Sequence, residues 1–388
     1  MPACLNGHRT AIRVWIKKAD GGQFKVVWDD IESTNLAPYN INEEAVIADA
    51  TAVREKLDRL VDAIMADQAA PLGPLLKDVA RAGRELYDDL FMDEGEAAVK
   101  AREWFEEQNQ PIRLTFVVDT YVHVPWGLIF DGNPDDIPEG STDMADYSDF
   151  WCIKYLVSCA YKNLDPTTVA NIKRQREFRL LPIVHPDEFN ASRLYVSAEE
   201  AEVVEKILTR FNAISDIRGL VRAWTDALGV NKILFFYCHG NGTRLAISST
   251  ESISSYELMK KLRFPSRQRV KCAALTFLNG CSTAVGEDKK GFIEAMTREG
   301  FCGFIGTEAD IPNVYALRFG VAFLHCMLET GWSVLDVVDT MRRAHWPLSL
   351  LYQIYGSPSF RIHRETVAGT APIQTFNFSR GPIGARPI

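Results

Sequence analysis

The chain has 388 residues, which suffices for two or three domains or for one large α/β unit. Its 43 Lys and Arg against 51 Asp and Glu leave a net charge of −8, which argues against a protein that follows nucleic-acid phosphates. No stretch approaches the roughly 18 apolar residues of a membrane span, and the first residues lack the apolar run of a secretory leader. The eight cysteines are sparse and lack paired zinc spacing. We therefore expect a soluble cytoplasmic protein with no cofactor or metal and no direct contact with nucleic acid or membrane.

The N-terminal region, residues 1–110, is expected to hold a β-hairpin followed by helices. Apolar and polar residues alternate over 12–16 and again over 24–28, and Asp20-Gly21-Gly22 between them supplies the turn. Apolar residues then recur at the spacing of one helical face. This periodicity predicts helices over residues 51–68, 75–90 and 95–107.

Residues 111–177 are expected to form the first sheet region of a larger α/β unit. Residues 112–118 have the continuous apolar pattern of a buried strand, and the segment VPWGLIFDG follows, in which Pro125 breaks any helix. A second strand-like apolar run covers residues 151–161, and residues 162–177 have the composition of a linker.

From residue 178 to residue 363, short apolar strands alternate with amphipathic helices, and residues 364–388 follow as a tail. Strands are predicted over 178–184, 232–238, 272–279 and 303–306, and helices over 198–211, 220–228, 256–262, 288–299, 314–329 and 334–344. This alternation is typical of a mostly parallel sheet covered by helices on both faces. We therefore predict an α/β sandwich of three layers.

Two of the predicted strands run directly into residues that can carry out covalent chemistry. One ends in FFYCHGNGT, which contains His239, and the other ends in LTFLNGCSTAVG, which contains Cys281. Catalytic groups gather beyond the carboxyl ends of parallel strands, so we expect both side chains to face one cleft. A thiol beside an imidazole has the two parts of a nucleophilic site, since the imidazole takes the thiol proton and later protonates the leaving amine. Gly240, Gly242 and Gly280 would let a bound chain approach the backbone.

The sequence alone leaves other interpretations of these residues open. A histidine at a strand end is often structural, and a cysteine there is often a packed thiol. Cys238 should face the opposite side of its strand from His239 and belong to the core. A zinc site built from Cys238, His239 and Cys281 has no recognised spacing.

At these residues the sequence resembles the CHAT family, relatives of caspases and separase within the caspase-like cysteine peptidases. The resemblance rests on FFYCHGNG and LTFLNGCSTA, and it continues through GFIEAMTREGFCGFIGTEADIP, GWSVLDVVDTMRRA and the closing segment LYQIYGSPSFRI. Upstream, VPWGLIFDG is similar to the Pro-Trp segment of the family. The similarity covers about residues 112–362 and implies a caspase-like sandwich whose catalytic region is 178–363.

The resemblance implies a role for each matching residue. His239 corresponds to the general acid and base of the family and Cys281 to its nucleophile, while the amides of Gly240 and Cys281 would form the oxyanion hole. Because Asn-Gly-Cys stands where caspases have Gln-Ala-Cys, cleavage after Asp is not implied.

The resemblance also implies where a substrate side chain would bind. In caspase-like enzymes the first specificity pocket lies just beyond the strand ends, where this chain has Asp187, Glu308 and Asp310. These acids would suit Lys or Arg before the cleaved bond, although an acid in such a segment is more often a solvated loop carboxylate. A preference for Asp would need a basic residue, and the nearest ones are Arg193 and Arg244.

Residues and resemblance together predict a cysteine endopeptidase that cleaves a specific protein target. Such relatives are regulated, so we expect an activating protein partner and a role in prokaryotic immunity (antiviral defence) or cell death. One alternative is a caspase-like scaffold or binding module without activity. Another is a thiol hydrolase of small esters or amides, whose usual Gly-x-Cys-x-Gly turn is absent because Asn279 and Thr283 occupy the glycine positions.

Overall fold

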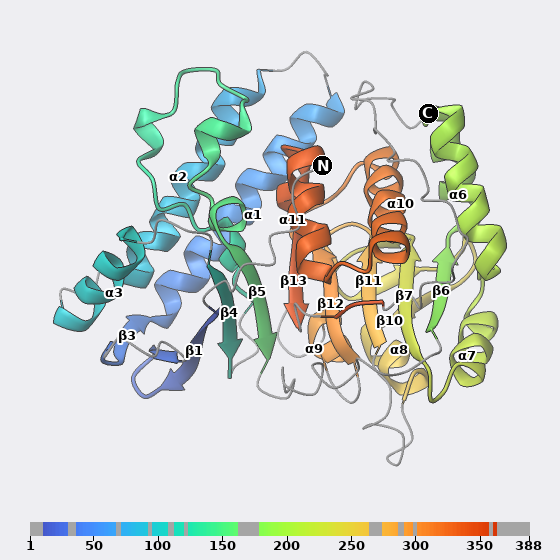
Figure 1. Ribbon diagram of the computed structural model, residues 1–388, viewed down its shortest axis with the longest axis horizontal. Coiled ribbons are helices and arrows are strands. Elements are labelled where there is room, and N and C mark those ends of the chain that lie inside the picture. The colour runs from blue at the N-terminus through green and yellow to red at the C-terminus, as the bar shows by residue number, and fades with distance from the viewer. Residues whose placement is uncertain are drawn as a thin grey trace.

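A single large sheet runs through the centre of the protein (Figure 1). The computed structural model describes residues 11–29, 36–66, 71–91, 95–107, 112–119, 123–161, 178–263, 274–285, 291–297, 301–356 and 360–362. Within these residues, ten strands form the sheet. In spatial order they are β3 (Tyr39–Asn42), β2 (Gln23–Asp29), β1 (Ala11–Ala19), β4 (Arg113–Val118), β5 (Leu156–Tyr161), β13 (Tyr352–Gly356), β12 (Phe301–Thr307), β11 (Ala274–Asn279), β7 (Asn231–Tyr237) and β6 (Phe178–Val184).

The sheet is mostly parallel, as predicted. β1 and β2 form the expected antiparallel hairpin, and β1 then pairs in parallel with β4, which pairs in parallel with β5. β6, β7, β11 and β12 form a second parallel block. β13 lies between the two blocks, parallel to β5 and antiparallel to β12. The N-terminal hairpin is therefore hydrogen-bonded into the same sheet as the strands of the later regions.

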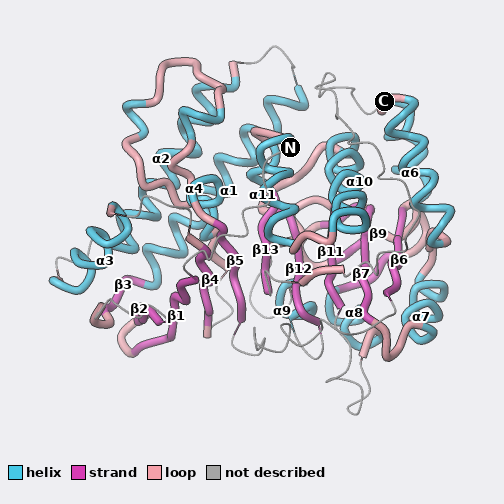
Figure 2. The backbone as a smooth tube through the Cα atoms, in the orientation of Figure 1, coloured by secondary structure: helices cyan, strands magenta, loops and turns pink. Residues whose placement is uncertain are grey.

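Helices cover both faces of this sheet (Figure 2). They are α1 (Glu43–Ala66), α2 (Leu72–Phe91), α3 (Glu96–Glu106), α4 (Trp151–Lys154), α5 (Pro186–Ser192), α6 (Ala198–Phe211), α7 (Ile217–Asp226), α8 (Ser255–Lys261), α9 (Phe292–Thr297), α10 (Asn313–Thr330) and α11 (Val334–Ala344). A small second sheet contains β8 (His239–Gly240), β9 (Arg244–Ala246) and β10 (Ser252–Ser254). No helix of the described part is both long enough and apolar enough to cross a bilayer.

Successive side chains of β7 point into two separate cores. Leu234 and Phe236 belong to the apolar cluster that contains residues of α7, α8 and α9, whereas Phe235 and Tyr237 belong to the cluster that contains residues of α6, α10 and α11. Burial of a large apolar side chain contributes about 1.5–3 kcal/mol, so both layers of helices help to hold the strand. The three-layer sandwich predicted from the sequence is confirmed.

Several elements differ from the prediction. α1 begins two turns before its predicted start because Asn42 caps it, with Oδ1 accepting from Ala45 N at 3.1 Å. Residues 151–161 are not one strand: a buried turn of helix, α4, precedes β5, and Trp151 N donates to Ile129 O at 2.8 Å. β3, β13 and α5 were not predicted.

Other predictions fall outside the described residues. These are the linker at 162–177, the tail at 364–388, and the outer parts of the strand predicted at 272–279 and of the helix predicted at 288–299.

Candidate active site

The carboxyl ends of β6, β7, β11 and β12 meet along one edge of the sheet because these strands are parallel. β7 and β11 also end in register. His239 lies just beyond the end of β7, and Cys281 lies just beyond the end of β11. The two turns approach each other so closely that a Cβ at Gly280 would come within 2.4 Å of the Cys238 carbonyl oxygen. Only glycine therefore fits at position 280.

His239 and Cys281 line a common cavity of about 560 Å³. Its other walls come from α1, from α5 and the residues after it, and from the segment between β12 and α10. The lining includes the carboxylates of Asp62, Glu188 and Asp310, and no Lys or Arg among the residues that the structure describes. The apolar lining residues are Val61, Met65, Ala191, Leu194, Ile311, Pro312 and Val314. The cavity is thus acidic and largely apolar.

Glu188 binds the imidazole of His239. Its Oε1 lies 2.6 Å from His239 Nε2, and its Oε2 accepts a hydrogen bond from the side-chain amide of Asn313. A neutral His239 that donates from Nε2 keeps the lone pair of Nδ1 free to take a proton. His239 thus has the arrangement of a general base whose ring is oriented by a further group, here the carboxylate of Glu188.

α5 brings Glu188 to the site because it begins directly after β6. His185 caps this helix through Nδ1, which accepts from Glu188 N at 3.4 Å, and Pro186 occupies the first turn. Asp187, predicted from the sequence, is therefore not the acid that reaches the site; its neighbour Glu188 is. Asp187 is exposed and does not line the cavity, since one step along a helix turns a side chain by about 100°. The sequence does contain a signal for α5: a strand end is followed by a proline and two acids, a pattern typical of the start of a helix.

The thiol of Cys281 is half-buried and protonated at neutral pH. Burial raises its pKa to about 11, and the carboxylates of Asp310 and Glu188 act in the same direction. Sγ donates a long hydrogen bond, 3.8 Å, to the carbonyl oxygen of Ile311. Because the thiolate is the reactive form of cysteine, this thiol needs a base when it attacks.

The turn after Cys281 is held against residues 308–312, which we call the wall loop. Ser282 adopts a left-handed conformation with φ 48°, which for a non-glycine residue costs about 1–3 kcal/mol. Its N donates to Ala309 O at 3.1 Å, and its Oγ donates to Asp310 Oδ1 at 2.7 Å. These two hydrogen bonds hold the strained turn in place.

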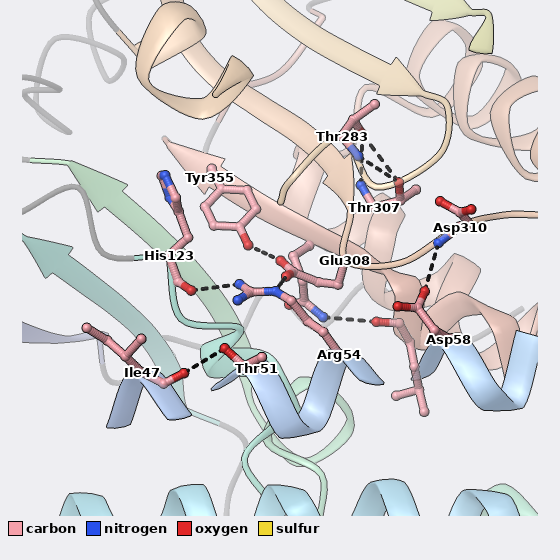
Figure 3. A network of polar contacts seen from close by, with 12 residues as sticks. Ile47, Thr51, Arg54, Asp58, His123, Thr283, Thr307, Glu308, Asp310 and Tyr355 are labelled. Atoms are coloured by element: carbon pink, nitrogen blue, oxygen red, sulfur yellow. Dashed lines mark hydrogen bonds and ion pairs between the residues drawn. The ribbon is translucent and has the colours of Figure 1, made fainter. Parts of the chain in front are cut away.

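The three acids predicted to bind a substrate side chain lie in different environments. Asp310 borders the cavity, whereas Asp187 does not. Glu308 is fully buried: Arg54 Nε lies 2.8 Å from its Oε2, and the hydroxyl of Tyr355 donates to its Oε1 (Figure 3). The expectation for Glu308 is therefore corrected, because its carboxylate is already paired inside the protein.

Two further residues named from the sequence lie at the strand ends. Gly240 is adjacent to the turn that begins at Cys281, since a Cβ there would come 3.0 Å from the Cys281 carbonyl oxygen. The assignment of the Gly240 and Cys281 amides to an oxyanion hole stays a prediction. Cys238 is buried in the core, as expected, and burial raises its pKa.

The basic residues considered for an Asp-directed pocket lie elsewhere. Arg193 pairs with Glu205 at 3.2 Å, and Arg244 donates to Ser252 Oγ at 2.9 Å. Neither lines the cavity. Within the described ranges, no group of three or more His, Cys, Asp or Glu side chains is arranged to hold a metal ion.

Comparison with known proteins finds solved structures of similar fold but no match by sequence. No protein-family model matches the sequence, and no curated protein matches it. Among solved structures, a chain of the separase–securin complex of Saccharomyces cerevisiae matches with a TM-score of 0.54 at 11% identity, over 90% of this chain and 30% of that one. The complex of the pro- and mature domains of RgpB from Porphyromonas gingivalis matches with a TM-score of 0.43 at 11% identity, over 71% of this chain and 72% of that one.

The chain spans less than a third of the length of the separase-complex chain that it matches. At this level of identity the likeness shows the fold alone. The protein has the caspase-like α/β sandwich that the sequence predicted.

Proposed function

We propose that the protein is a cysteine endopeptidase in which Cys281 is the nucleophile and His239 the general acid and base. The observation that supports this most strongly is the shared cavity: a thiol and an imidazole bound by Glu188 line it together, just beyond two strands that end in register. Glu188 orients the imidazole and is a positioning residue.

The proposed reaction passes one proton through His239 in each of its two halves. Nδ1 takes the thiol proton while Sγ bonds to the carbonyl carbon of the substrate, and the carbonyl oxygen becomes an oxyanion. The tetrahedral intermediate collapses, the C–N bond breaks, and the imidazolium protonates the leaving amine. Water then attacks the thioester with His239 as base, which releases the acid and restores the thiol. Proton transfer of this kind contributes about 10² to 10⁴ in rate.

The raised pKa of Cys281 determines how the thiol is activated. With a pKa of about 11, about one thiol in ten thousand is ionised at pH 7. A preformed thiolate is therefore a minor species, and attack requires proton removal by His239 in the substrate complex.

The lining of the cavity supports a basic residue before the cleaved bond. Asp62 and Asp310 supply negative charge, and the apolar side chains of Met65 and Ile311 suit the aliphatic stem of Arg or Lys. An Asp side chain would meet only like charge there. The substrate class we propose is a polypeptide with Arg or Lys at this position.

The biological role is proposed on the resemblance to the CHAT family. We propose a cytoplasmic effector of prokaryotic immunity or cell death that cuts a chosen protein and is controlled by a protein partner. The separase structure with the similar fold is a complex with securin, which supports a search for a partner of this chain.

A non-catalytic scaffold is the second candidate. The feature that favours it is the raised pKa of Cys281, which burial of the thiol causes, because a protonated thiol is unreactive.

Fluorogenic peptides with Arg, Lys or Asp before the leaving group test these proposals. The purified protein should cleave the Arg or Lys peptides, and Cys281→Ala should abolish cleavage. Cys326→Ala is the matched control, since Cys326 is also a half-buried free cysteine but lies on α10, away from the cavity. Cleavage that persists in Cys281→Ala would contradict the assigned nucleophile.

A further inference from the structure

α1 belongs to the N-terminal region, yet it forms part of the cavity. Val61, Asp62 and Met65, in the last turns of this helix, line the cavity together with Cys281 and His239. The helix also contacts the wall loop at two points nearer its middle. Both contacts involve polar groups that reach across to the end of β12.

The first contact is the ion pair between Arg54 and Glu308. The side chain of Arg54 is 13% exposed and that of Glu308 is 0% exposed. Arg54 also donates from Nη2 to the carbonyl oxygen of His123 at 2.7 Å, which fixes the direction of the guanidinium (Figure 3). Separation of the two charges is strongly disfavoured, because it would leave the buried carboxylate of Glu308 without a cation.

The second contact lies one turn further along the same helix. Asp58 Oδ1 accepts a hydrogen bond from the backbone N of Asp310 at 3.3 Å (Figure 3). Asp58 itself is exposed, so this contact can be removed without leaving a buried charge.

The opposite side of the wall loop holds the nucleophile. Ala309 and Asp310 accept the two hydrogen bonds of Ser282, and Ile311 accepts the thiol hydrogen of Cys281. The loop is therefore bound by α1 on one side and by the cysteine turn on the other. The contacts on the two sides involve the four consecutive residues 308–311, so a displacement on the α1 side would be transmitted through them to Cys281.

We propose that Arg54 and Asp58 are positioning residues through which α1 holds the wall loop against Cys281, and thereby sets both the reactivity of the thiol and the shape of the substrate cavity. The N-terminal helix is then the element through which a bound partner would reach the cysteine. The cavity part of this inference rests on the proposed peptidase function, whereas the thiol part does not.

Alkylation of the whole protein by iodoacetamide tests the thiol part without any substrate. The rate at each cysteine is measured by peptide mapping for the wild type, Asp58→Ala, Asp58→Asn and Arg54→Met. Asn keeps an acceptor oxygen at position 58, so Asp58→Asn is the conservative variant. Arg59→Ala is the control on the same helix, since Arg59 is exposed and has no hydrogen bond or ion pair recorded within the described residues.

We expect Asp58→Ala and Arg54→Met to raise alkylation at Cys281 and to leave buried Cys238 protected. A loosened wall loop exposes the thiol, and each unit by which its pKa falls gives roughly a threefold gain in rate at about pH 8, because lower basicity offsets part of the larger thiolate fraction. Asp58→Asn and Arg59→Ala should match the wild type. In the peptide assay, Asp58→Ala should raise KM more than it lowers kcat.

Several results would overturn the inference. Unchanged alkylation of Cys281 in both Asp58→Ala and Arg54→Met would mean that α1 does not control the thiol. A parallel rise at Cys238 would mean general unfolding instead. If Arg54→Met does not fold, the double variant Arg54→Met with Glu308→Gln removes both buried charges and must show the same selective rise. Loss of peptide cleavage by every variant and the wild type would count against the proposed function while leaving the alkylation result valid.

Discussion

His239 Nε2 and Glu188 Oε1 lie 2.6 Å apart although 51 residues separate them in the chain. They meet because β6 and β7 are parallel neighbours, so the residues that follow each strand emerge at the same edge of the sheet. The same topology brings Cys281 to the cavity from β11. The three side chains thus come from three consecutive strands of the parallel block.

Substitution of Glu188 should lower turnover without abolishing substrate binding. Glu188→Gln keeps the shape of the side chain but removes the carboxylate that orients the imidazole, so we expect kcat to fall by about 10², with a smaller change in KM. Asp187→Asn is the matched control, because Asp187 is the neighbouring exposed acid outside the cavity. Equal kcat values for the two variants would remove Glu188 from the mechanism.

The alkylation rate of Cys281 should report its raised pKa. Since the thiolate is the reacting species, the rate should rise about tenfold per pH unit from neutral pH and level off only near a pKa of about 11. Asp310→Asn removes a negative charge that raises this pKa, so the profile should shift to lower pH. Iodoacetamide kinetics across the pH range provide the test. A profile that levels off near pH 8.5, the value of an ordinary thiol, would show that the site does not suppress ionisation.

The Arg54–Glu308 pair should matter for stability far more than a surface pair. Arg54→Met leaves the buried carboxylate of Glu308 without its cationic partner and with the Tyr355 hydroxyl alone, which costs about 3–5 kcal/mol in the free energy of unfolding. Arg81→Met breaks the exposed pair with Asp135 and should cost at most about 1 kcal/mol. Urea titrations of both variants give the comparison. Similar losses in the two variants would argue that Glu308 is not buried as described.

Gly280→Ala should damage the active site through backbone displacement. The added methyl would meet the Cys238 carbonyl oxygen at 2.4 Å, so the turns after β7 and β11 must move apart. We expect loss of peptide cleavage, together with lower stability of at least about 1 kcal/mol. Activity assays and thermal unfolding measure the two effects. Full activity in a stable Gly280→Ala protein would contradict the close approach of the turns.

The sequence was sufficient to predict the three layers of the fold. Of the side chains Glu188, His239 and Cys281, it was sufficient to predict the last two as neighbours at one edge of the sheet. Long apolar strands that alternate with helices specify a parallel sheet, and a parallel sheet forces His239 and Cys281 to one edge. Glu188 was missed because α5 is short, and a shift of one residue on a helix decides whether Asp187 or Glu188 faces the cavity. Glu308 was assigned to substrate because its partner, Arg54, lies 254 residues earlier in the chain, and no local pattern reveals such a pair.

The position of β13 in the sheet could not be predicted from the sequence either. Its residues, 352–356, come late in the chain, but the strand inserts in the middle of the sheet, parallel to β5 and antiparallel to β12. Apolar residues in sequence predict that a strand is buried, but they do not specify its neighbours.

Covalent labelling with an arginyl peptide that carries a thiol-directed acyloxymethyl ketone tests the central claim most directly. The reagent needs a cavity that accepts the peptide, a reactive sulfur and a base, and mass spectrometry locates the label. We predict a single adduct at Cys281 in the wild type, strongly reduced labelling in His239→Ala, and full labelling in Asp187→Asn. Labelling at Cys281 that is unchanged by His239→Ala, or labelling spread over other cysteines, would contradict a catalytic pair in this cavity.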